Sequence, residues 1–215
     1  MKPVDAEAQK AFEELVGQRR FVYHIMTKDR YRNAVLCGHL ASRNALGNVR
    51  NDYAIKNLVA IRSGIQIDDD TGILDTVPFY LTPRQPMFCR LVREGRVKAE
   101  DLMALGFDFD ALHERYKHWL FTSNPAYEGS RLLGRWDAKG ELGWEMLLRW
   151  WWNSDSDVQE EKLRCSFLRQ AELLVKSPVD LDDVHHIVVH SGSRALHDLE
   201  IAGKVVTQIV GIFDW

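Results

Sequence analysis

The sequence predicts an α+β fold, in which short strands and helices share one domain covering residues 1–215. Short apolar runs bounded by Gly, Pro or charged residues recur between segments with helical spacing. The chain has no Gly-x-Gly-x-x-Gly motif and no phosphate-binding loop, which argues against a doubly wound nucleotide-binding fold. Because no Pro-, Gly- or Ser-rich linker divides the chain, we expect one core.

Composition narrows the class of protein. The chain of 215 residues is 46% hydrophobic and has a formal net charge of −3. This charge argues against a protein that coats polyanions over its whole surface, but it does not exclude a local basic face. Cys37, Cys89 and Cys165 are widely spaced, which favours reduced thiols that fill the core of a cytoplasmic protein. No secretory signal pattern or membrane-length apolar run occurs, so we expect no membrane partner.

The first third of the chain predicts alternating helices and a strand. Residues 6–16 have apolar side chains at helical spacing, and residues 21–26 follow as a strand. Thr27 then begins a second helix. Its inner side is expected to consist of Tyr31, Ala34, Val35 and Leu36. A weaker helical pattern covers residues 55–62.

Residues 77–87 have the most unusual composition. Three prolines surround the aromatic pair Phe79-Tyr80, which predicts a strand that leads into a rigid turn. Rigid aromatic segments hold planar ligands or cap a core. The densest basic cluster of the chain follows and consists of Arg84, Arg90, Arg93, Arg96 and Lys98. This cluster fits contacts to phosphates and fits a solvated face equally well.

The rest of the chain predicts further helices, strands and one aromatic segment. We expect helices at residues 99–105, 110–119 and 193–202, and strands at 120–125, 185–190 and 205–213. Between them, Trp150, Trp151 and Trp152 stand in a row. Three consecutive side chains cannot all face one core, so at least one is expected to face a ligand, a base or the loop itself.

Two groups of potential metal ligands are not expected to bind a metal ion. Asp68, Asp69 and Asp70 lack the spaced ligands and terminal Glu of a calcium loop and predict a solvated turn. His185 and His186 are adjacent and would face opposite sides of a strand. The sequence therefore predicts no metal site.

An acidic residue stands out in the apolar run of residues 165–175, which predicts one strand stopped by Ser177-Pro178. Because side chains alternate along a strand, Gln170 and Glu172 would share a face. A carboxylate among buried aliphatic side chains is costly unless it is paired. Either the strand lies at an edge with one solvated face, or Glu172 faces a cleft and stabilises developing positive charge beside a sugar.

Taken together, four segments resemble the DarT family of nucleic-acid-modifying ADP-ribosyltransferase toxins. These segments are Tyr23-His24-Ile25, residues 55–62, residues 75–80 with Pro83-Arg84-Gln85-Pro86-Met87, and Arg169-Gln170-Ala171-Glu172. The resemblance implies an ADP-ribosyltransferase fold with two facing, mostly antiparallel sheets, flanking helices, and NAD as co-substrate in the cleft. It also implies single-stranded DNA or RNA as acceptor and an antitoxin with ADP-ribosyl hydrolase activity as partner.

The resemblance assigns roles to individual residues. Glu172 and Arg62 would be catalytic, with Arg62, or else Arg50, holding NAD. The other residues at NAD would be His24, Thr27, Phe79, Tyr80 and Met87. The acceptor would contact Gln170, Trp151, Arg84 and Arg90, and Trp151 would stack on a nucleobase.

The chain departs from the family pattern at three positions of these segments. Family members often have His in place of Thr27, Asn in place of Arg30 and Ser in place of Gln85. The departures leave the acceptor open among thymine, guanine and an RNA base. Three functions therefore compete: a toxin that modifies single-stranded DNA, a transferase acting on RNA or protein, and a catalytically silent nucleic-acid-binding module that uses the basic cluster.

Overall fold

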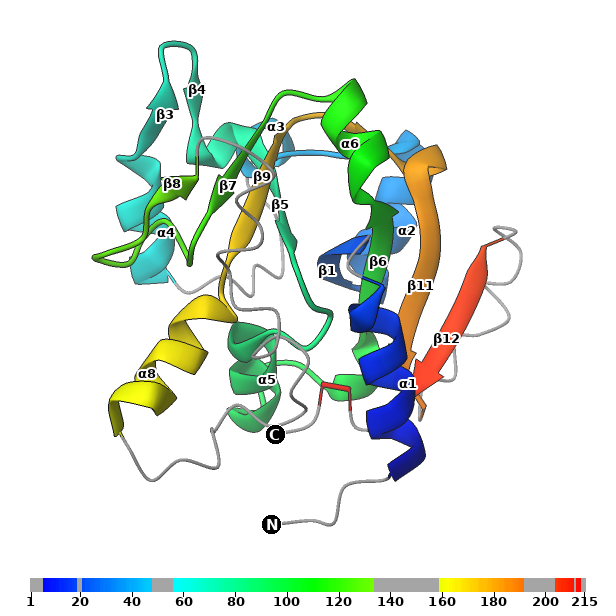
Figure 1. The fold of residues 1–215 in the computed structure, drawn as a ribbon. Helices are drawn as coiled ribbons and strands as arrows, with labels where there is room; N and C mark the ends of the chain where they lie inside the picture. The colour runs from blue at the N-terminus through cyan, green and yellow to red at the C-terminus, as the bar shows by residue number, and fades with distance from the viewer. Residues whose placement is uncertain are drawn as a thin grey trace.

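A computed structural model describes residues 6–18, 21–47, 56–133, 159–191, 204–210 and 212–213. Its largest element is an eight-stranded sheet with the strand order β12-β11-β6-β1-β5-β9-β7-β8 (Figure 1). The strands are β1 (Phe21–Thr27), β5 (Thr76–Tyr80), β6 (Leu102–Asp108), β7 (His118–Phe121), β8 (Leu132–Leu133), β9 (Glu172–Lys176), β11 (Val184–His190) and β12 (Val205–Ile209). Every neighbouring pair is antiparallel except β11 and β12.

The sheet consists of two halves that meet at one paired position. Strands β1 and β5 share only the pair Tyr23↔Tyr80, whereas β1 and β6 pair along the whole of β1. Figure 1 shows β1, β6, β11 and β12 on one side and β5, β9, β7 and β8 on the other. The α+β class and the mostly antiparallel pairing are confirmed. In place of two separate facing sheets, eight of the described strands form one sheet that divides between β1 and β5.

Helices and two small ribbons surround this sheet. The helices are α1 (Ala6–Gly17), α2 (Lys28–Cys37), α3 (Arg43–Leu46), α4 (Lys56–Ser63), α5 (Pro86–Arg93), α6 (Phe109–Arg115) and α8 (Gln159–Leu168), with short 3-10 turns η1 (Ile73–Asp75), η2 (Ala99–Asp101) and η4 (Leu181–Asp183). The ribbons pair β2 (His39–Leu40) with β10 (Val179–Asp180), and β3 (Gln66–Asp68) with β4 (Thr71–Gly72). In Figure 1, α4 and the β3–β4 ribbon lie beside the β9–β7–β8 side, and α1 lies beside β11 and β12.

Local sequence signals explain how the helices near the cleft begin. Thr27 caps α2, and its hydroxyl oxygen accepts the backbone N–H of Arg30. Helix α5 has Pro86 at its first position, where a missing N–H costs nothing, and the Gln85 side chain accepts the N–H of Met87 at 2.6 Å. The strand and rigid turn predicted over residues 77–87 are therefore present, and the segment also contains the start of helix α5, which was not predicted.

The core lies mainly between the sheet and α1, α5 and α6. Residues Leu102, Met103, Ala104 and Leu105 of β6 are all at most 1% exposed. Both faces of this central strand are therefore buried. The helix predicted at residues 99–105 is wrong, because a strand buried on both faces shows no alternation and Ala, Leu and Met favour helices in isolation.

Three further sequence predictions are corrected by the structure. Residues 165–168 end helix α8, so the predicted strand begins only at Glu172. Strand β9 lies between β5 and β7, which excludes the edge-strand explanation for its carboxylate. The helix predicted at residues 110–119 ends at Arg115, and β7 begins at His118.

Helix α2 differs from prediction in its inner side. Tyr31 is buried as expected, but Val35 and Leu36 are 50% and 85% exposed. The helix is also followed by Gly38, whose φ of 76° ends it in the left-handed conformation that glycine adopts at little cost. Cys37 is exposed, so only Cys89 and Cys165 fill the core as expected. The predictions for Trp150, Trp151 and Trp152 and for a helix at residues 193–202 concern residues outside the described part of the chain.

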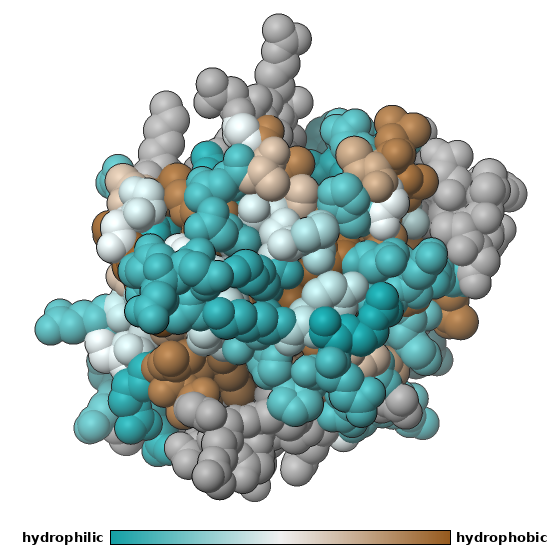
Figure 2. All heavy atoms as spheres, turned by 90° about the horizontal axis from the view of Figure 1, so that it is seen from above, coloured by the Kyte–Doolittle hydropathy of each residue, from teal (hydrophilic) through white to brown (hydrophobic). Residues whose placement is uncertain are grey.

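Polar residues dominate the end of the molecule where α6 and the β3–β4 ribbon lie. Seen from that end, most of the described surface is hydrophilic, with smaller hydrophobic areas between (Figure 2). No helix in the described part of the chain has the length and apolar character needed to cross a membrane.

Candidate active site

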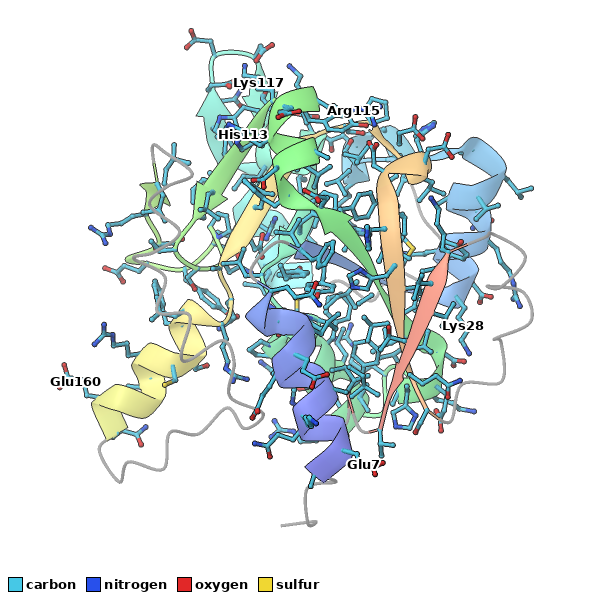
Figure 3. All side chains as sticks on the ribbon, turned by 45° about the vertical axis from the view of Figure 1, so that its right-hand side comes forward. Glu7, Lys28, His113, Arg115, Lys117 and Glu160 are labelled. Atoms are coloured by element: carbon cyan, nitrogen blue, oxygen red, sulfur yellow. The ribbon has the colours of Figure 1, made fainter. Side chains whose placement is uncertain are left out.

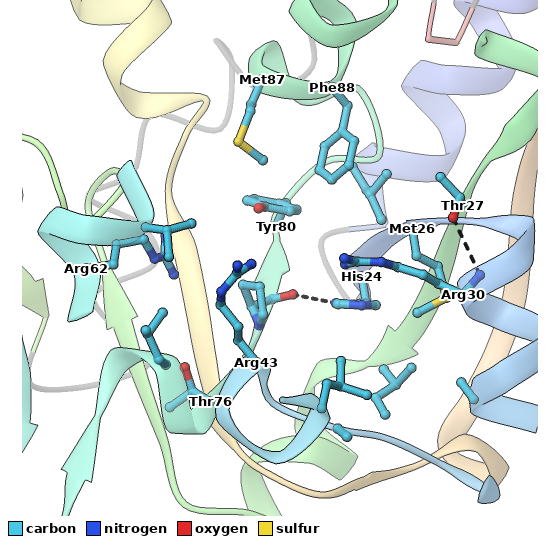
Figure 4. A pocket seen from close by; sticks show the side chains of 18 of the residues that line it. His24, Met26, Thr27, Arg30, Arg43, Arg62, Thr76, Tyr80, Met87 and Phe88 are labelled. Carbon is cyan, nitrogen blue, oxygen red and sulfur yellow. Dashed lines mark hydrogen bonds between the residues drawn. The ribbon is translucent and has the colours of Figure 1, made fainter. Parts of the chain in front are cut away.

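A cavity of about 290 Å³ lies where the two halves of the sheet separate (Figure 4). Its walls come from the neighbouring strands β1 and β5 and from helices α2, α3, α4 and α5. Because β1 and β5 share only one pair, their remaining edge positions are available to line a ligand site. Five residues predicted to bind NAD line this cavity: His24, Thr27, Arg62, Tyr80 and Met87.

The acidic group of the site is Glu172, the first residue of β9. It is 1% exposed and stands in register with Tyr80 of β5 and Phe121 of β7. Arg62, near the end of α4, donates from Nη1 to both carboxylate oxygens, at 3.1 and 2.9 Å. The same nitrogen lies 3.3 Å from Oδ1 of Asn124. The carboxylate is thus held by a cation that itself lines the cavity.

Burial and the neighbouring Arg62 have opposite effects on the pKa of Glu172. Burial raises the pKa of Glu172, while the charge and hydrogen bonds of Arg62 act to lower it. Burial likewise raises the pKa of the Tyr80 phenol, and the negative charge of Glu172 adds to this effect. The phenol therefore stays neutral. A carboxylate that keeps a cationic partner in a dry site can stabilise positive charge on a substrate with little screening.

His24 forms a second contact between the two halves of the sheet. Its Nδ1 lies 2.8 Å from the carbonyl oxygen of Pro78 in β5. A carbonyl only accepts, so Nδ1 carries the proton and Nε2 is an acceptor. Burial lowers the pKa of His24 to about 4, and the positive charge of Arg30 adds to this effect, although the Pro78 carbonyl opposes it. At neutral pH the site therefore offers an uncharged imidazole.

Phe79 is not part of the cavity wall. It is fully buried and packs edge to face on Phe107, with ring centroids 5.0 Å apart. Adjacent residues of a strand point to opposite faces, so Phe79 and Tyr80 cannot both face the cavity. Of the two aromatic residues predicted at NAD, the structure brings only Tyr80 to the site.

The predicted acceptor-binding residues are dispersed. Gln170 lies in the turn after α8, where its Nε2 donates to the carbonyl of Ser166 at 3.1 Å, so it does not share a strand face with Glu172. Arg84 is 1% exposed and donates to the carbonyl of Ile212 at 3.0 Å. Its placement in an exposed basic cluster is therefore wrong.

The remaining predictions for the acceptor have different outcomes. Arg90 is on the exposed side of α5, where its Nε lies 2.6 Å from Glu94. Trp151 and Arg50 lie outside the described residues.

Several polar residues that line the cavity were not predicted from the sequence, among them Arg30, Arg43 and Asn124. Arg43 follows Ser42, whose hydroxyl caps α3 by accepting the N–H of Ala45. Asn124 follows β7, and its Oδ1 accepts the N–H of Ala126 as well as the contact from Arg62. A helix cap and a turn are visible in the sequence, but the approach of Arg43 and Asn124 to the cavity depends on long-range packing.

The described residues contain no group of three or more His, Cys, Asp or Glu side chains close enough to hold a metal ion. His185 and His186 lie on β11, in the half of the sheet away from Glu172. The polar groups that the described residues bring to the cavity and to Glu172 beside it include a carboxylate, an arginine, an imidazole and a phenol.

Comparison with solved structures identifies the fold. DarT of Thermus sp. 2.9 in complex with ADP-ribosylated ssDNA superposes with a TM-score of 0.76 at 19% identity, over 92% of this chain and 97% of that chain. The same protein in complex with NAD+ gives a TM-score of 0.70 at 20% identity. Thermosipho africanus DarTG in complex with ADP-ribose gives 0.72 at 18% identity, and the match covers 90% of this chain and 51% of that chain. The fold is therefore the one that these DarT structures share.

Sequence comparison is more specific. A DNA ADP-ribosyl transferase of Thermus sp. (strain 2.9) is 23% identical over 176 residues, which cover 79% of this chain and 81% of the relative. The family model described as "ssDNA thymidine ADP-ribosyltransferase, DarT" matches residues 23–205. The chain therefore belongs to the DarT family of ADP-ribosyltransferases.

Proposed function

We propose that this protein transfers ADP-ribose from NAD to a base of single-stranded DNA. The observation that carries the proposal is the buried Glu172 carboxylate, held by Arg62 next to a cavity with a neutral imidazole and a neutral phenol in its wall. The family description and the Thermus complexes with NAD+ and with ADP-ribosylated ssDNA support this assignment of substrates.

In this proposal the cavity binds the nicotinamide end of NAD. The Tyr80 ring and the Met87 side chain offer apolar surface for the planar nicotinamide. The Nε2 atom of His24 accepts a ribose hydroxyl, because its Nδ1 proton is engaged by Pro78. Thr27 lies at the same wall, where family members often have His, and offers a smaller polar contact. Arg62 positions Glu172 and contacts the nucleotide.

The proposed reaction breaks the bond between C1′ of the ribose and the nicotinamide nitrogen. The bonding electron pair leaves with nicotinamide, which becomes neutral, and positive charge develops on the ribose as an oxocarbenium-like state. Glu172 accepts a hydrogen bond from a ribose hydroxyl and stabilises this charge. A base nitrogen then attacks C1′ and forms the new N-glycosidic bond, and Glu172 accepts the proton that the nitrogen releases.

Single-stranded DNA is the proposed acceptor because an attacking base must be unstacked and unpaired to reach C1′. Arg90, exposed on α5 one helical turn from Met87, is a candidate for a phosphate contact. Gln170 and Trp151 remain candidates for contacts with the base. The buried position of Arg84 gives it no support as an acceptor-binding residue.

We further propose that the protein acts as a toxin and that an antitoxin with ADP-ribosyl hydrolase activity removes the modification. Modified bases would block copying of the template strand. The likeness to Thermosipho africanus DarTG in complex with ADP-ribose supports this arrangement. The test is growth of cells that express this chain with and without a candidate hydrolase encoded beside it, using Glu172→Ala as the inactive control.

The acceptor is tested by transfer of labelled ADP-ribose from NAD to single-stranded DNA, RNA and protein. Homopolymers of thymine and guanine in the DNA series identify the base. Label on DNA that disappears in Glu172→Ala is the expected result. Label on RNA or protein alone would move the substrate class, and intact NAD with a well-folded protein would overturn the transferase proposal in favour of a binding module.

A further inference from the structure

Arg62 contacts a second side chain besides Glu172, that of Asn124. Figure 4 shows Arg62 reaching from α4 towards the cavity. The Oδ1 atom of Asn124 lies 3.3 Å from Nη1 of Arg62, the nitrogen that also donates to both carboxylate oxygens of Glu172. This nitrogen has two hydrogens, of which the carboxylate can take one and the amide oxygen the other. Both hydrogens of Nη1 are therefore engaged.

The side chain of Asn124 is itself held by the turn that it begins. It is 3% exposed, and its Oδ1 also accepts the backbone N–H of Ala126 at 3.0 Å, which is the contact of an Asx turn. The backbone carbonyl of Asn124 accepts the N–H of Tyr127 at 2.9 Å. Both partners of the side-chain amide are donors, so they must face its oxygen and not its nitrogen. The turn therefore presents this oxygen to Arg62 in one orientation.

The turn is anchored to the strand that carries Glu172. Strand β7 ends at Phe121, which stands opposite Glu172 in β9, and the turn follows directly. Ser123 is fully buried, and its hydroxyl donates to the carbonyl of Phe167 at 2.8 Å. Ser130, at the far end of the turn, donates from its hydroxyl to the carbonyl of Ser123 at 3.1 Å. The amide oxygen and the carboxylate are thus fixed in one frame.

A second acceptor matters because of how Arg62 contacts Glu172. Both hydrogen bonds to the carboxylate come from one nitrogen, so the pair lacks the two-nitrogen fork in which arginine often grips a carboxylate. A planar group held at one nitrogen can pivot about that nitrogen. The long arginine side chain also has many rotamers. An acceptor at a fixed position on the same nitrogen restricts this movement, and Asn124 supplies one.

We propose that Asn124 is a positioning residue, which holds the Arg62 guanidinium in the orientation that keeps Glu172 in place for the transfer of ADP-ribose. The inference rests on the proposed roles of Glu172 and Arg62. Asn124 acts through Arg62 and needs no contact with the substrate. Because a displacement of about 1 Å at the reacting groups can cost about 100-fold in rate, loss of the contact should lower kcat more than it raises KM for NAD.

Two substitutions separate the contact with Arg62 from the turn. Asn124→Ser keeps an oxygen that can accept the N–H of Ala126, but this oxygen is one bond closer to the backbone and withdraws from Arg62. We expect kcat for nicotinamide release to fall by about 10–100-fold, with a smaller change in KM for NAD. Asn124→Asp keeps the oxygen at full reach. This variant should recover most of the lost rate at alkaline pH.

The Asn124→Asp variant gives a second, independent measurement. Among the described residues, the titratable groups that act on Glu172 are Arg62 of α4 and the neutral Tyr80 of β5. A carboxylate at position 124 would share the charge of Arg62 and raise the pKa of Glu172. Since Glu172 acts as the anion, the acidic limb of the kcat profile should move to higher pH. An unchanged acidic limb would overturn the coupling through Arg62, even if Asn124→Ser did not fold.

The matched control is Ser130→Ala, which removes a hydrogen bond from the same turn without touching Arg62. Its kcat should stay near native, and thermal unfolding confirms that each variant is folded. A native kcat in folded Asn124→Ser, or an equal loss in Ser130→Ala, would overturn the positioning role and leave the proposed function intact. So would an Asn124→Asp variant as slow as Asn124→Ser at alkaline pH. A native chain that releases no nicotinamide from NAD would overturn the proposed function itself.

Discussion

Strand β9 has an ion pair at each end. The two pairs have similar distances between their charged atoms, but they differ in how far their side chains are exposed. At its first residue, Glu172 lies 2.9 Å from Arg62, and the two side chains are 1% and 14% exposed. At its last residue, Lys176 lies 2.8 Å from Asp70, and these side chains are 39% and 63% exposed. Only the first pair borders the cavity. Similar distances therefore do not imply similar roles.

Burial explains the difference between the two pairs. In the interior, a charge loses its hydration and depends on one partner. The pair is therefore costly to form, and removal of one partner leaves the other as an uncompensated buried charge. At the surface, water solvates each partner and salt screens the attraction. Glu172 keeps a costly position next to a cavity, which is the pattern expected of a functional group. The pair at Lys176 joins the β3–β4 ribbon to the sheet.

The largest difference between the two ends of β9 should appear in catalysis. Glu172→Gln keeps the shape of the side chain but removes its charge, so we expect NAD cleavage and DNA modification to fall by about 10²–10⁴-fold. Lys176→Gln, at the other end of the strand, should leave both rates near native. Initial rates of nicotinamide release measure the effect. Equal rates for Glu172→Gln and the native chain would remove Glu172 from the reaction.

The second difference concerns stability when one partner is removed. Arg62→Met leaves Glu172 buried without its cation and should cost about 3–5 kcal/mol in the free energy of unfolding. The double variant Arg62→Met/Glu172→Leu removes both charges and should recover most of this loss. Urea unfolding of the native chain and these variants gives the comparison. A double variant that is less stable than Arg62→Met would show that the pair is held for stability.

His186 is a buried polar group without a charged partner among the described residues, and it can be compared with the buried pair of Glu172 and Arg62. His186 on β11 is 4% exposed, and its ring lies so close to Gly106 that an added Cβ would be 2.4 Å away. Its Nε2 has no hydrogen-bond partner among the described residues. Burial lowers the pKa of His186 to about 4, with the nearby His185 adding to the effect. Without a counter-charge, this group is expected to stay neutral in the fold.

This contrast predicts a loss of stability in acid. Because the pKa of His186 is about 4 in the fold and about 6.5 when unfolded, its contribution is complete above pH 6.5 and is lost as the pH falls towards 4. The difference corresponds to about 3 kcal/mol. His186→Phe should flatten the pH dependence of the free energy of unfolding over this range. Parallel curves for the native chain and His186→Phe would contradict the assignment.

The sequence predicted the parts of the fold that local chemistry determines. The first two helices, β1 and the strand and turn at residues 76–86 follow from spacing, caps and prolines. The central strand β6 was predicted to be a helix, since Ala104 and its apolar neighbours are buried on both faces and give no alternation. The boundary between α8 and β9 was missed because the apolar run of residues 165–175 covers the end of one element and the start of the other.

The candidate site was predictable where one residue conflicted with its surroundings. Glu172 stood out as a carboxylate in an apolar run, and the structure gives it a cationic partner. The alternation of a strand says that Phe79 and Tyr80 face opposite sides, but it does not say which side holds the cavity. Arg43 and Asn124 approach the site through contacts between distant segments, which no local pattern encodes.

The smallest expected effect tests the exposed pair of β9. Asp70 accepts from Lys176 at 2.8 Å and from Lys117 at 3.3 Å, and Lys117 lies at the end of the molecule that carries the β3–β4 ribbon (Figure 3). The hydrogen bond from Lys176 and the other polar contacts lower the pKa of Asp70, yet its solvated surroundings make the network replaceable. Asp70→Asn should lower Tm by no more than about 2 °C, less at high salt, and leave nicotinamide release unchanged. Scanning calorimetry at two salt concentrations measures it. A fall in Tm as large as that of Arg62→Met would contradict this expectation. It would mean that the exposed pair also stabilises the fold strongly, by attaching the β3–β4 ribbon to the sheet.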